Sequence, residues 1–200
     1  IGMWDRSNGS IPAGWLRWML EHFRYDFSLV LQPELEKGDL NDKYDVLIFV
    51  GGAIPSSANK TIPQLKKFLE NGGKVVTIGS SANLARHLEV PVSDALTELV
   101  RGTEKSLPRE KYFIPGSVLR VRVAPGVPAT WGMEEHADVY FSNNPVFRIT
   151  SGGYSDSRVE PLMWFDTAAP LRSGWAYGQS YLKDGIAAFK VKIGQGELYV

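Results

Sequence analysis

One short segment of the sequence has the residue types and spacing of a catalytic turn. It reads Ile-Gly-Ser-Ser-Ala-Asn over residues 78–83 and follows an apolar run, so Ser81 stands where a strand-to-helix turn would lift a side chain above a sheet. Backbone N–H groups at such a turn can stabilise an oxyanion, which makes Ser81 a candidate nucleophile. However, Asn83 replaces the second glycine of the Gly-x-Ser-x-Gly pattern. We therefore expect a structural serine whose hydroxyl caps the following helix.

The three histidines, His22, His87 and His136, are badly placed to act as a general base for this serine. His22 and His87 fall in segments with helical spacing, and the helix carrying His87 leads away from the turn. Glu134 and Glu135 precede His136, but three consecutive residues cannot all point at one ion from a regular strand or helix. We expect these three residues to be solvated surface. The sequence contains no cysteine, which excludes thiolate zinc ligands, disulfides and a cysteine nucleophile. We therefore expect no metal and no cofactor in this chain.

A pair of glycines marks a second candidate region. Gly51 and Gly52 directly follow an apolar run at residues 46–50, at the carboxyl edge where open α/β sheets bind ligands. Neither Gly-x-Gly-x-x-Gly nor a Gly-Lys-Ser/Thr ending is present, so a phosphate loop is not indicated. The candidates for ligand binding are Gly51, Gly52, Ser80 and Ser81.

The composition narrows the choice of partners. The 22 basic and 22 acidic side chains balance, which removes the usual reason to expect a nucleic acid or an anionic membrane surface. The apolar runs are far too short to span a bilayer, so no transmembrane segment is expected. Three of the six tryptophans, Trp4, Trp164 and Trp175, fall near expected strand ends and could line a groove. Most tryptophans in a domain of this size nevertheless belong to the core or its rim.

The first half alternates strands and helices, as in a parallel, doubly wound sheet. Strands are expected at residues 1–4, 27–31, 44–50 and 74–78, and the last two, being almost unbroken apolar runs, should be central neighbours covered on both faces. The first helix should begin after Ser10, with Pro12 in its first turn. Its apolar residues follow helical spacing and form one wide face: Trp15, Leu16, Met19, Leu20 and Phe23. A second helix should start at Thr61, direct Leu65, Phe68 and Leu69 inward, and stop at residues 71–73.

The second half reads as β-structure. Alternating apolar and charged residues at 117–123 predict a strand with one wet face, and further strands are expected at 139–141, 162–165 and 185–193. The last of these should form a hairpin through the glycine-rich turn at 194–196. We expect one domain over residues 1–200. Because the chain opens and stops inside strands, we also expect it to be a piece of a longer protein.

Eight blocks of the sequence resemble the C-terminal region of bacterial zinc-carboxypeptidase-like proteins of the carboxypeptidase A type. The blocks span almost the whole chain: Ile1-Gly-Met-Trp-Asp-Arg6, Gly14-Trp-Leu-Arg-Trp18, Lys43-Tyr-Asp-Val-Leu-Ile-Phe-Val50, Thr61-Ile-Pro-Gln-Leu-Lys66, Ile78-Gly-Ser-Ser81, Leu107-Pro-Arg-Glu-Lys-Tyr112, Pro115-Gly-Ser-Val-Leu-Arg120 and Pro170-Leu-Arg-Ser-Gly-Trp175. In that group a peptidase domain comes first and a class I glutamine amidotransferase-like domain follows. The resemblance implies an α/β, flavodoxin-like doubly wound sheet with additional β-structure in the second half.

The resemblance also bears on sites, partners and location. Active amidotransferases of this class carry a cysteine at the elbow, where this chain has Ser81. Zinc and the catalytic glutamate would belong to the peptidase domain of the same parent chain, which is the implied partner. The parent protein would be exported from the cytoplasm.

Three functions follow from these observations. The first is a non-catalytic accessory domain that aids the stability or substrate binding of the peptidase domain. The second is a serine hydrolase or acyl-transfer enzyme that uses Ser81. The third is a small-ligand-binding module at the carboxyl edge of the sheet, near Gly51 and Ser80.

Overall fold

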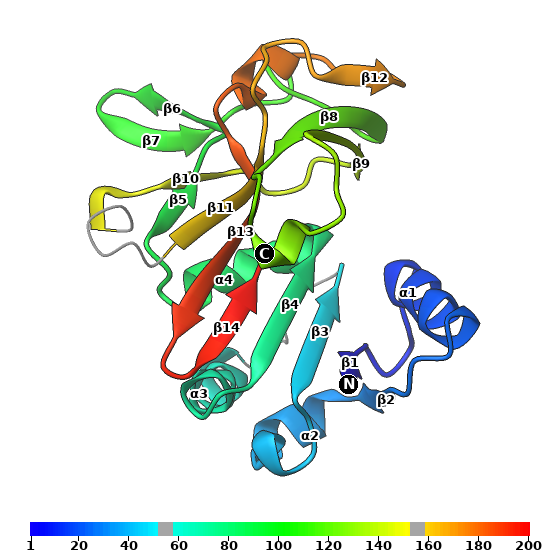
Figure 1. The fold of residues 1–200 in the computed structure, drawn as a ribbon. Coiled ribbons are helices and arrows are strands. Elements are labelled where there is room, and N and C mark those ends of the chain that lie inside the picture. The colour runs from blue at the N-terminus through cyan, green and yellow to red at the C-terminus, as the bar shows by residue number, and fades with distance from the viewer. Residues whose placement is uncertain (52–57, 153–158) are drawn as a thin grey trace. The chain divides into compact units, whose positions relative to one another are not determined.

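Residues 1–51, 58–152 and 159–200 are described in a computed structural model of the protein (Figure 1). Gly52, one of the candidate ligand-binding residues, lies outside these ranges. The chain divides into two units. Unit 1 consists of Ile1–Val90 and Val191–Val200, and unit 2 consists of Pro91–Lys190.

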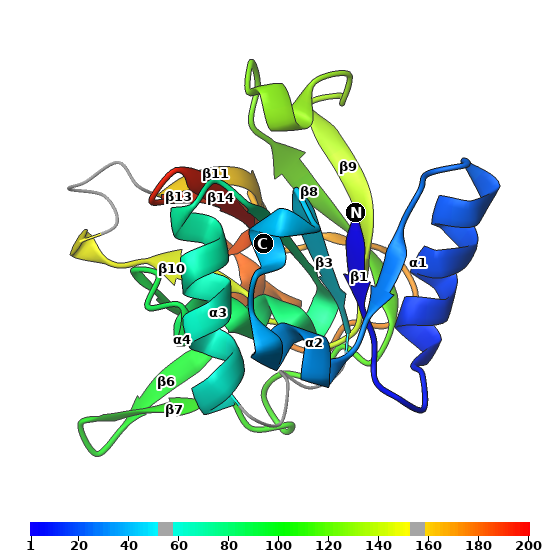
Figure 2. The same ribbon diagram turned by 90° about the horizontal axis from the view of Figure 1, so that it is seen from below.

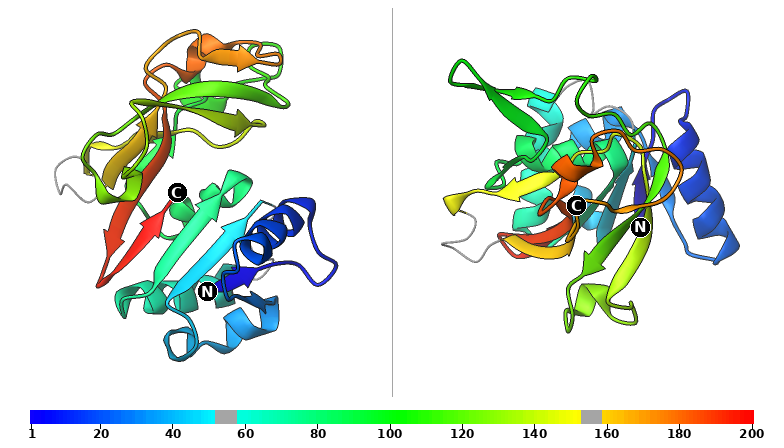
Figure 3. Two further views of the ribbon diagram at one scale, coloured as in Figure 1. Left: turned by 45° about the vertical axis from the view of Figure 1, so that its right-hand side comes forward. Right: turned by 90° about the horizontal axis from the view of Figure 1, so that it is seen from above.

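Unit 1 is built on a sheet of five parallel strands in the order β2-β1-β3-β4-β14. This order is the 2-1-3-4-5 arrangement of flavodoxin-like folds, with the last strand supplied from the C-terminal end of the sequence. Figure 3 shows the C-terminus at the end of β14, beside β4. The strands are β1 (Gly2–Trp4), β2 (Ser28–Val30), β3 (Val46–Val50), β4 (Lys74–Ile78) and β14 (Gly196–Tyr199).

The two apolar runs expected to be neighbours are neighbours. Strands β3 and β4 pair over their full length, with Leu47 opposite Val75 and Val50 opposite Ile78. Leu47 and Val75 are fully buried, whereas Ile78 is largely exposed. The cover expected on both faces is therefore complete on one face only: Phe49 is buried beside Leu47 and Val75, whereas Ile48 and Val76 on the other face are half-buried.

The helices of unit 1 begin close to the expected residues. The Ala13 backbone N–H donates to Ser10 Oγ (3.3 Å), which confirms the predicted cap of α1. Helix α3 begins at Ala58 rather than at Thr61, and Leu65, Phe68 and Leu69 are fully buried as predicted. The described helical segments of unit 1 are α1 (Ile11–His22), α2 (Gln32–Lys37), η1 (Leu40–Asp42), α3 (Ala58–Glu70), η2 (Gly79–Asn83) and α4 (Leu84–His87). No helix within the described ranges is long and apolar enough to cross a membrane.

The apolar face expected on α1 is only partly buried. Leu16 and Leu20, together with Ala13, pack against Met3 of β1 and Val50 of β3. The larger side chains of the expected face point away from this contact and are exposed: Trp15, Met19 and Phe23. Helix α1 therefore uses its small and aliphatic residues for the core and presents its aromatic residues outward.

The connection into β14 makes very close backbone contacts with the end of α3. The Gln195 N–H donates to Glu70 O (3.2 Å), and the Glu197 N–H donates to Gly73 O (3.3 Å). A Cβ atom at Gly196 would lie 2.2 Å from Gly73 O and 2.4 Å from Leu69 O. Only glycine fits at this position, because both obstacles are backbone atoms.

Unit 2 is mostly antiparallel β-structure. The predicted strand at 117–123 is confirmed as β8, which pairs antiparallel with β9, β11 and β12. The predicted hairpin is confirmed by the pairing of β13 with β14 around Gly194. The strands of this unit are β5 (Val92–Asp94), β6 (Thr97–Val100), β7 (Thr103–Ser106), β8 (Ser117–Val123), β9 (His136–Phe141), β10 (Phe147–Ile149), β11 (Val159–Trp164), β12 (Leu171–Ser173) and β13 (Ile186–Ile193), whose last three residues belong to unit 1.

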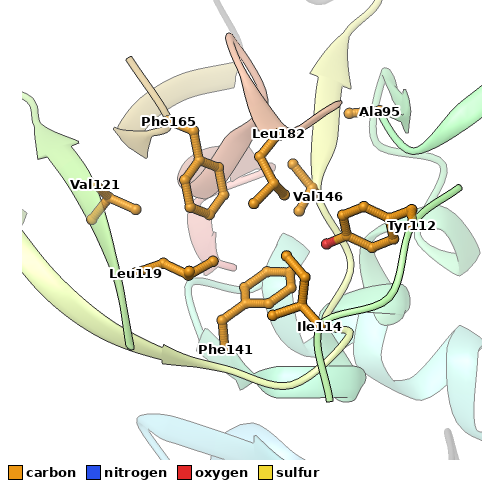
Figure 4. Close-up of a cluster of buried hydrophobic side chains, with 9 residues drawn as sticks. All are labelled: Ala95, Tyr112, Ile114, Leu119, Val121, Phe141, Val146, Phe165 and Leu182. Carbon is orange, nitrogen blue, oxygen red and sulfur yellow. The ribbon is translucent and has the colours of Figure 1, made fainter. Parts of the chain in front are cut away.

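An aromatic cluster forms the core of unit 2 (Figure 4). The rings of Phe141 and Phe165 meet edge to face with centroids 6.0 Å apart. Tyr112 is buried in the same cluster, and its hydroxyl has no hydrogen-bond partner within the described part of the chain. Burial disfavours the charged phenolate and thus raises the pKa of Tyr112 well above its usual value of about 10.

Candidate functional site

The strand order of unit 1 indicates where a ligand would bind. The chain runs from β1 to β2 on one side and then crosses to β3 on the other, so the connections diverge between β1 and β3. Ligands of open α/β sheets bind at such a switch point, at the carboxyl ends of the strands. Here the strands end at Trp4 and Val50, and Asp5 and Gly51 follow them. We take this edge as the candidate site; Figure 2 shows β1 and β3 beside each other, with α1 to one side.

Trp4 contributes an unused hydrogen-bond donor at this edge. Its ring is buried and stacks on Phe49 at a centroid distance of 5.9 Å. Its Nε1 atom is buried, and no acceptor for it is present among the described residues. A buried donor without a partner costs about 1–3 kcal/mol, which a ligand carrying an acceptor would recover. The sequence placed Trp4 near a strand end, but the spacing of its neighbours gives no sign of the unpaired donor.

Gly51 has a structural role at the same edge. Its φ of 44° lies in the left-handed region. A Cβ atom here would lie 2.8 Å from Pro12 Cγ, so the first turn of α1 packs directly against this residue. The Gly51 N–H donates to Ile78 O at 2.9 Å. Its amide is therefore committed to the sheet and is not directed at a ligand.

Ser81 is also bonded to the backbone. Its side chain is only 4% exposed, and Oγ lies 2.7 Å from Phe49 O and 2.8 Å from Ile78 O. A hydroxyl has one proton, so Ser81 donates to one of these carbonyl oxygens at a time. The predicted helix cap is wrong, because the helical turn begins at Gly79 and Ser81 lies inside it rather than ahead of it.

The turn around Ser81 also lacks the strained geometry of a nucleophile elbow. The left-handed residue is Gly79, with a φ of 69°, and neither Ser80 nor Ser81 is among the described residues with positive φ. The side chain of Ser80 is exposed, and its carbonyl accepts a hydrogen bond from Asn83 Nδ2 (3.2 Å). The turn thus joins β4 to α4 without presenting Ser81 to solvent.

A charged network in unit 2 includes the third histidine. Nε2 of His136 lies 3.2 Å from Asp166 Oδ2, and Arg122 Nη2 lies 2.7 Å from Glu135 Oε1. Glu134 and Glu135 are exposed as expected, whereas His136 is half-buried and paired. The sequence did not indicate this pairing, because Asp166 follows β11 and β11 reaches β9 only through β8. Within the described part of the chain, no group of three or more histidine or carboxylate side chains could hold a metal ion.

A hollow of about 740 Å³ lies in the connection between β8 and β9, lined by residues 122–128 and 130–135. Thr130 Oγ1 donates to Ala124 O (2.7 Å) and holds the connection in shape. The indole of Trp131 is almost fully exposed in this lining, to which the Arg122–Glu135 ion pair also belongs. The sequence did not single out Trp131.

Comparison with known proteins establishes the fold. No protein-family model and no curated protein sequence matches this chain. A ThuA-like protein from Bacteroides uniformis is similar in structure, with a TM-score of 0.57 and 11% identity over 98% of this chain and 79% of that one. A glutamine amidotransferase from Thermotoga maritima has a TM-score of 0.56 and 13% identity over 99% and 74% of the two chains. A cold-adapted β-galactosidase from Rahnella sp. R3 has a TM-score of 0.53 and 13% identity over 99% of this chain and 27% of that one.

These likenesses confirm the predicted fold class. The protein has a flavodoxin-like, class I glutamine amidotransferase-like fold with additional β-structure in its second half. At sequence identities this low, structural similarity shows the fold and not the activity.

Proposed function

We propose that this chain is a non-catalytic accessory domain of a larger zinc-carboxypeptidase-like protein, where it supports the stability or substrate binding of the peptidase domain. The state of Ser81 carries the proposal. Ser81 stands where an amidotransferase-like elbow would hold its nucleophile, but its hydroxyl is buried and donates to backbone carbonyl oxygens. A hydroxyl in this state cannot attack a substrate without breaking the turn.

The histidines of unit 1 give Ser81 no base. His22 stacks on Trp18 at a centroid distance of 5.2 Å, and His87 is exposed at the end of α4. Neither is a hydrogen-bond partner of Ser81 Oγ, whose two contacts among the described residues are both carbonyl oxygens. A serine is a weak nucleophile unless a nearby group takes its proton, which favours the accessory function over a hydrolase or acyl-transfer enzyme.

Two further observations support an accessory role. The resemblance of eight sequence blocks connects the chain to proteins in which a peptidase domain precedes it. The likeness to the β-galactosidase covers 27% of that chain, so this fold also occurs as a minor part of a much longer enzyme. Under this proposal the zinc belongs to the peptidase domain of the parent chain, and the parent acts outside the cytoplasm.

Removing the domain from the parent protein tests the accessory role. We expect the parent without residues 1–200 to lose at least about 5 °C in the Tm of its peptidase domain, or about tenfold in kcat/KM on peptides. Calorimetry and peptide hydrolysis would be compared for the two proteins at equal zinc loading. An unchanged Tm together with an unchanged kcat/KM would contradict the proposal.

Replacing the serine tests the absence of catalysis. We expect Ser81→Ala to lower the free energy of unfolding of unit 1 by about 1 kcal/mol, because it removes one buried hydrogen bond. Ser28→Ala, at an exposed position of β2, is the matched control and should change it by less than about 0.5 kcal/mol. Denaturant melts give both values. A fluorophosphonate probe should label neither protein; stoichiometric labelling that vanishes in Ser81→Ala would establish the hydrolase instead.

Trp4 favours a second candidate function, the binding of a small ligand at the switch point. Its buried Nε1 donor has no acceptor within the described ranges, so a ligand there would present an acceptor oxygen or nitrogen. Native mass spectrometry of the purified protein distinguishes this function from the first. A small molecule carried through purification would favour the binding module, whereas a bare chain would leave the accessory role in first place.

A further inference from the structure

The side of α1 that faces away from the sheet is covered with large apolar side chains. We call it the outer face of α1 and define it by Ile11 (80% exposed), Trp15 (68%), Trp18 (58%), Met19 (44%) and Phe23 (64%). In Figure 2 this helix lies at the border of unit 1, beyond β1. A soluble protein rarely exposes so many large apolar side chains together unless another surface covers them.

Ring contacts fix the outer face in one arrangement. Trp15 and Trp18 meet edge to face at a centroid distance of 6.4 Å, and Trp18 stacks on His22 at 5.2 Å. The helix beneath them is held by its Ser10 cap and by the buried Leu16 and Leu20. These contacts restrict the two indoles before binding, which lowers the conformational entropy that binding to this face would cost.

We propose that the outer face of α1 is the contact surface of a symmetric dimer, covered by the same face of a second copy of this chain. Fully covering an aromatic side chain buries roughly 150–250 Å². Scaled by the exposed fractions above, the three aromatic residues offer roughly 300–500 Å² in each copy, and with Ile11 and Met19 a pair of faces buries on the order of 1,000 Å². That total reaches the lower limit for a stable, specific interface, and polar neighbours would enlarge it. Two-fold pairs of this kind, in which the same patch serves both copies, are the commonest oligomers.

The sequence of α1 suits an antiparallel pairing of two such helices. Ile11, Gly14 and Trp18 follow one another at helical spacing, and a Cβ atom at Gly14 would meet no other atom within 4 Å. Gly14 therefore leaves a gap between two bulky side chains, into which a side chain of the second copy fits. With the two-fold axis between Trp15 and Trp18, Trp15 of each copy lies opposite Trp18 of the other copy. The Arg17–Glu21 ion pair (2.8 Å) lies to one side, where it stays in water.

Sedimentation velocity on the chain at about 1–200 μM tests the dimer. We expect a species of twice the chain mass, with a dissociation constant on the order of 10 μM. Trp18→Glu should raise that constant at least about 100-fold, because both copies lose a central aromatic side chain and gain a charge. Trp131→Glu, at a still more exposed tryptophan in unit 2, is the matched control and should leave the constant unchanged.

Gly14→Gln separates a lost interface from a lost fold. A glutamine at this exposed position near the start of α1 should raise the Tm of unit 1, because glycine is a poor helix former. The same side chain fills the gap at the interface and should weaken the dimer at least about tenfold. A chain that stays monomeric over the whole range would overturn the proposal and assign the face to a different protein or domain. So would a dimer that Trp18→Glu and Gly14→Gln leave intact, or an assembly larger than two copies.

Discussion

Gly196→Ala is expected to lower the free energy of unfolding of unit 1 by about 4 kcal/mol, or to prevent β14 from docking altogether. The added Cβ would lie 2.2 Å from Gly73 O and 2.4 Å from Leu69 O, and neither backbone atom can move without displacing the end of α3. Displacing β14 would also uncover Leu198, which is fully buried, and would open the edge of β4. Urea unfolding followed by circular dichroism measures the loss.

Gly14→Ala is the matched control for this substitution within the same unit. Its Cβ would meet nothing within 4 Å, and its helical position favours alanine over glycine by about 0.5–1 kcal/mol. The two exchanges add the same methyl group and should move stability in opposite directions. If the Gly196→Ala protein were as stable as the native one, the turn into β14 would have to accommodate a Cβ atom, contrary to the close backbone contacts described above.

Phe165→Ala is expected to cost about 3–5 kcal/mol in unit 2. Phe165 is fully buried, and its ring meets Phe141 edge to face, so truncation leaves a cavity and removes an aromatic pair. The rigid strands around it close the cavity only in part. Amide hydrogen exchange should become faster in β8, β9 and β11, and the free energy of opening derived from it should fall by the same amount. Unchanged exchange in these strands would mean that the cluster is not the core of unit 2.

Tyr112→Phe is the control within the same cluster. It deletes a buried hydroxyl that has no partner among the described residues, and it leaves no cavity, so it should not destabilise the protein. Its effect should depend on pH. Burial raises the pKa of Tyr112 in the folded state above its unfolded value of about 10. Below about pH 10 the phenol is neutral in both states, and its contribution to stability is fully present. Above about pH 10 the unfolded chain loses the phenol proton more readily than the folded protein, so the folded state loses stability as the pH rises. Tyr112→Phe should remove that alkaline loss.

Local structure followed from the sequence wherever one residue type decides it. Ser10 caps α1 because its hydroxyl can accept from Ala13 N–H, and Gly72, with a φ of 95°, ends α3 because glycine tolerates the left-handed conformation required there. The side of α1 that meets the sheet did not follow. Apolar residues surround most of this helix, so spacing alone cannot tell Leu16 and Leu20 from Trp15 and Phe23.

The pairing of strands that are distant in the sequence could not be predicted, for a different reason. The hairpin at 194–196 was predictable, but nothing in its residues indicates that β14 returns to pair with β4, more than a hundred residues away. The same applies to the candidate site. Ser81 could be recognised as a turn residue, whereas its bond to Phe49 O depends on how β3 and β4 pair, and the unpaired Trp4 donor depends on how the whole edge packs.

The late arrival of β14 has a consequence for synthesis on the ribosome. Unit 1 lacks its fifth strand until the 100 residues of Pro91–Lys190 have been made, which at roughly 5–20 residues per second takes roughly 5–20 s. During that interval the β4 edge that later pairs with β14 is open to other strands. Unit 2 is continuous in sequence and can complete its own core first. Mutations that slow the folding of unit 2 should therefore promote aggregation of nascent chains through the open β4 edge of unit 1, although the mutated residues lie in unit 2.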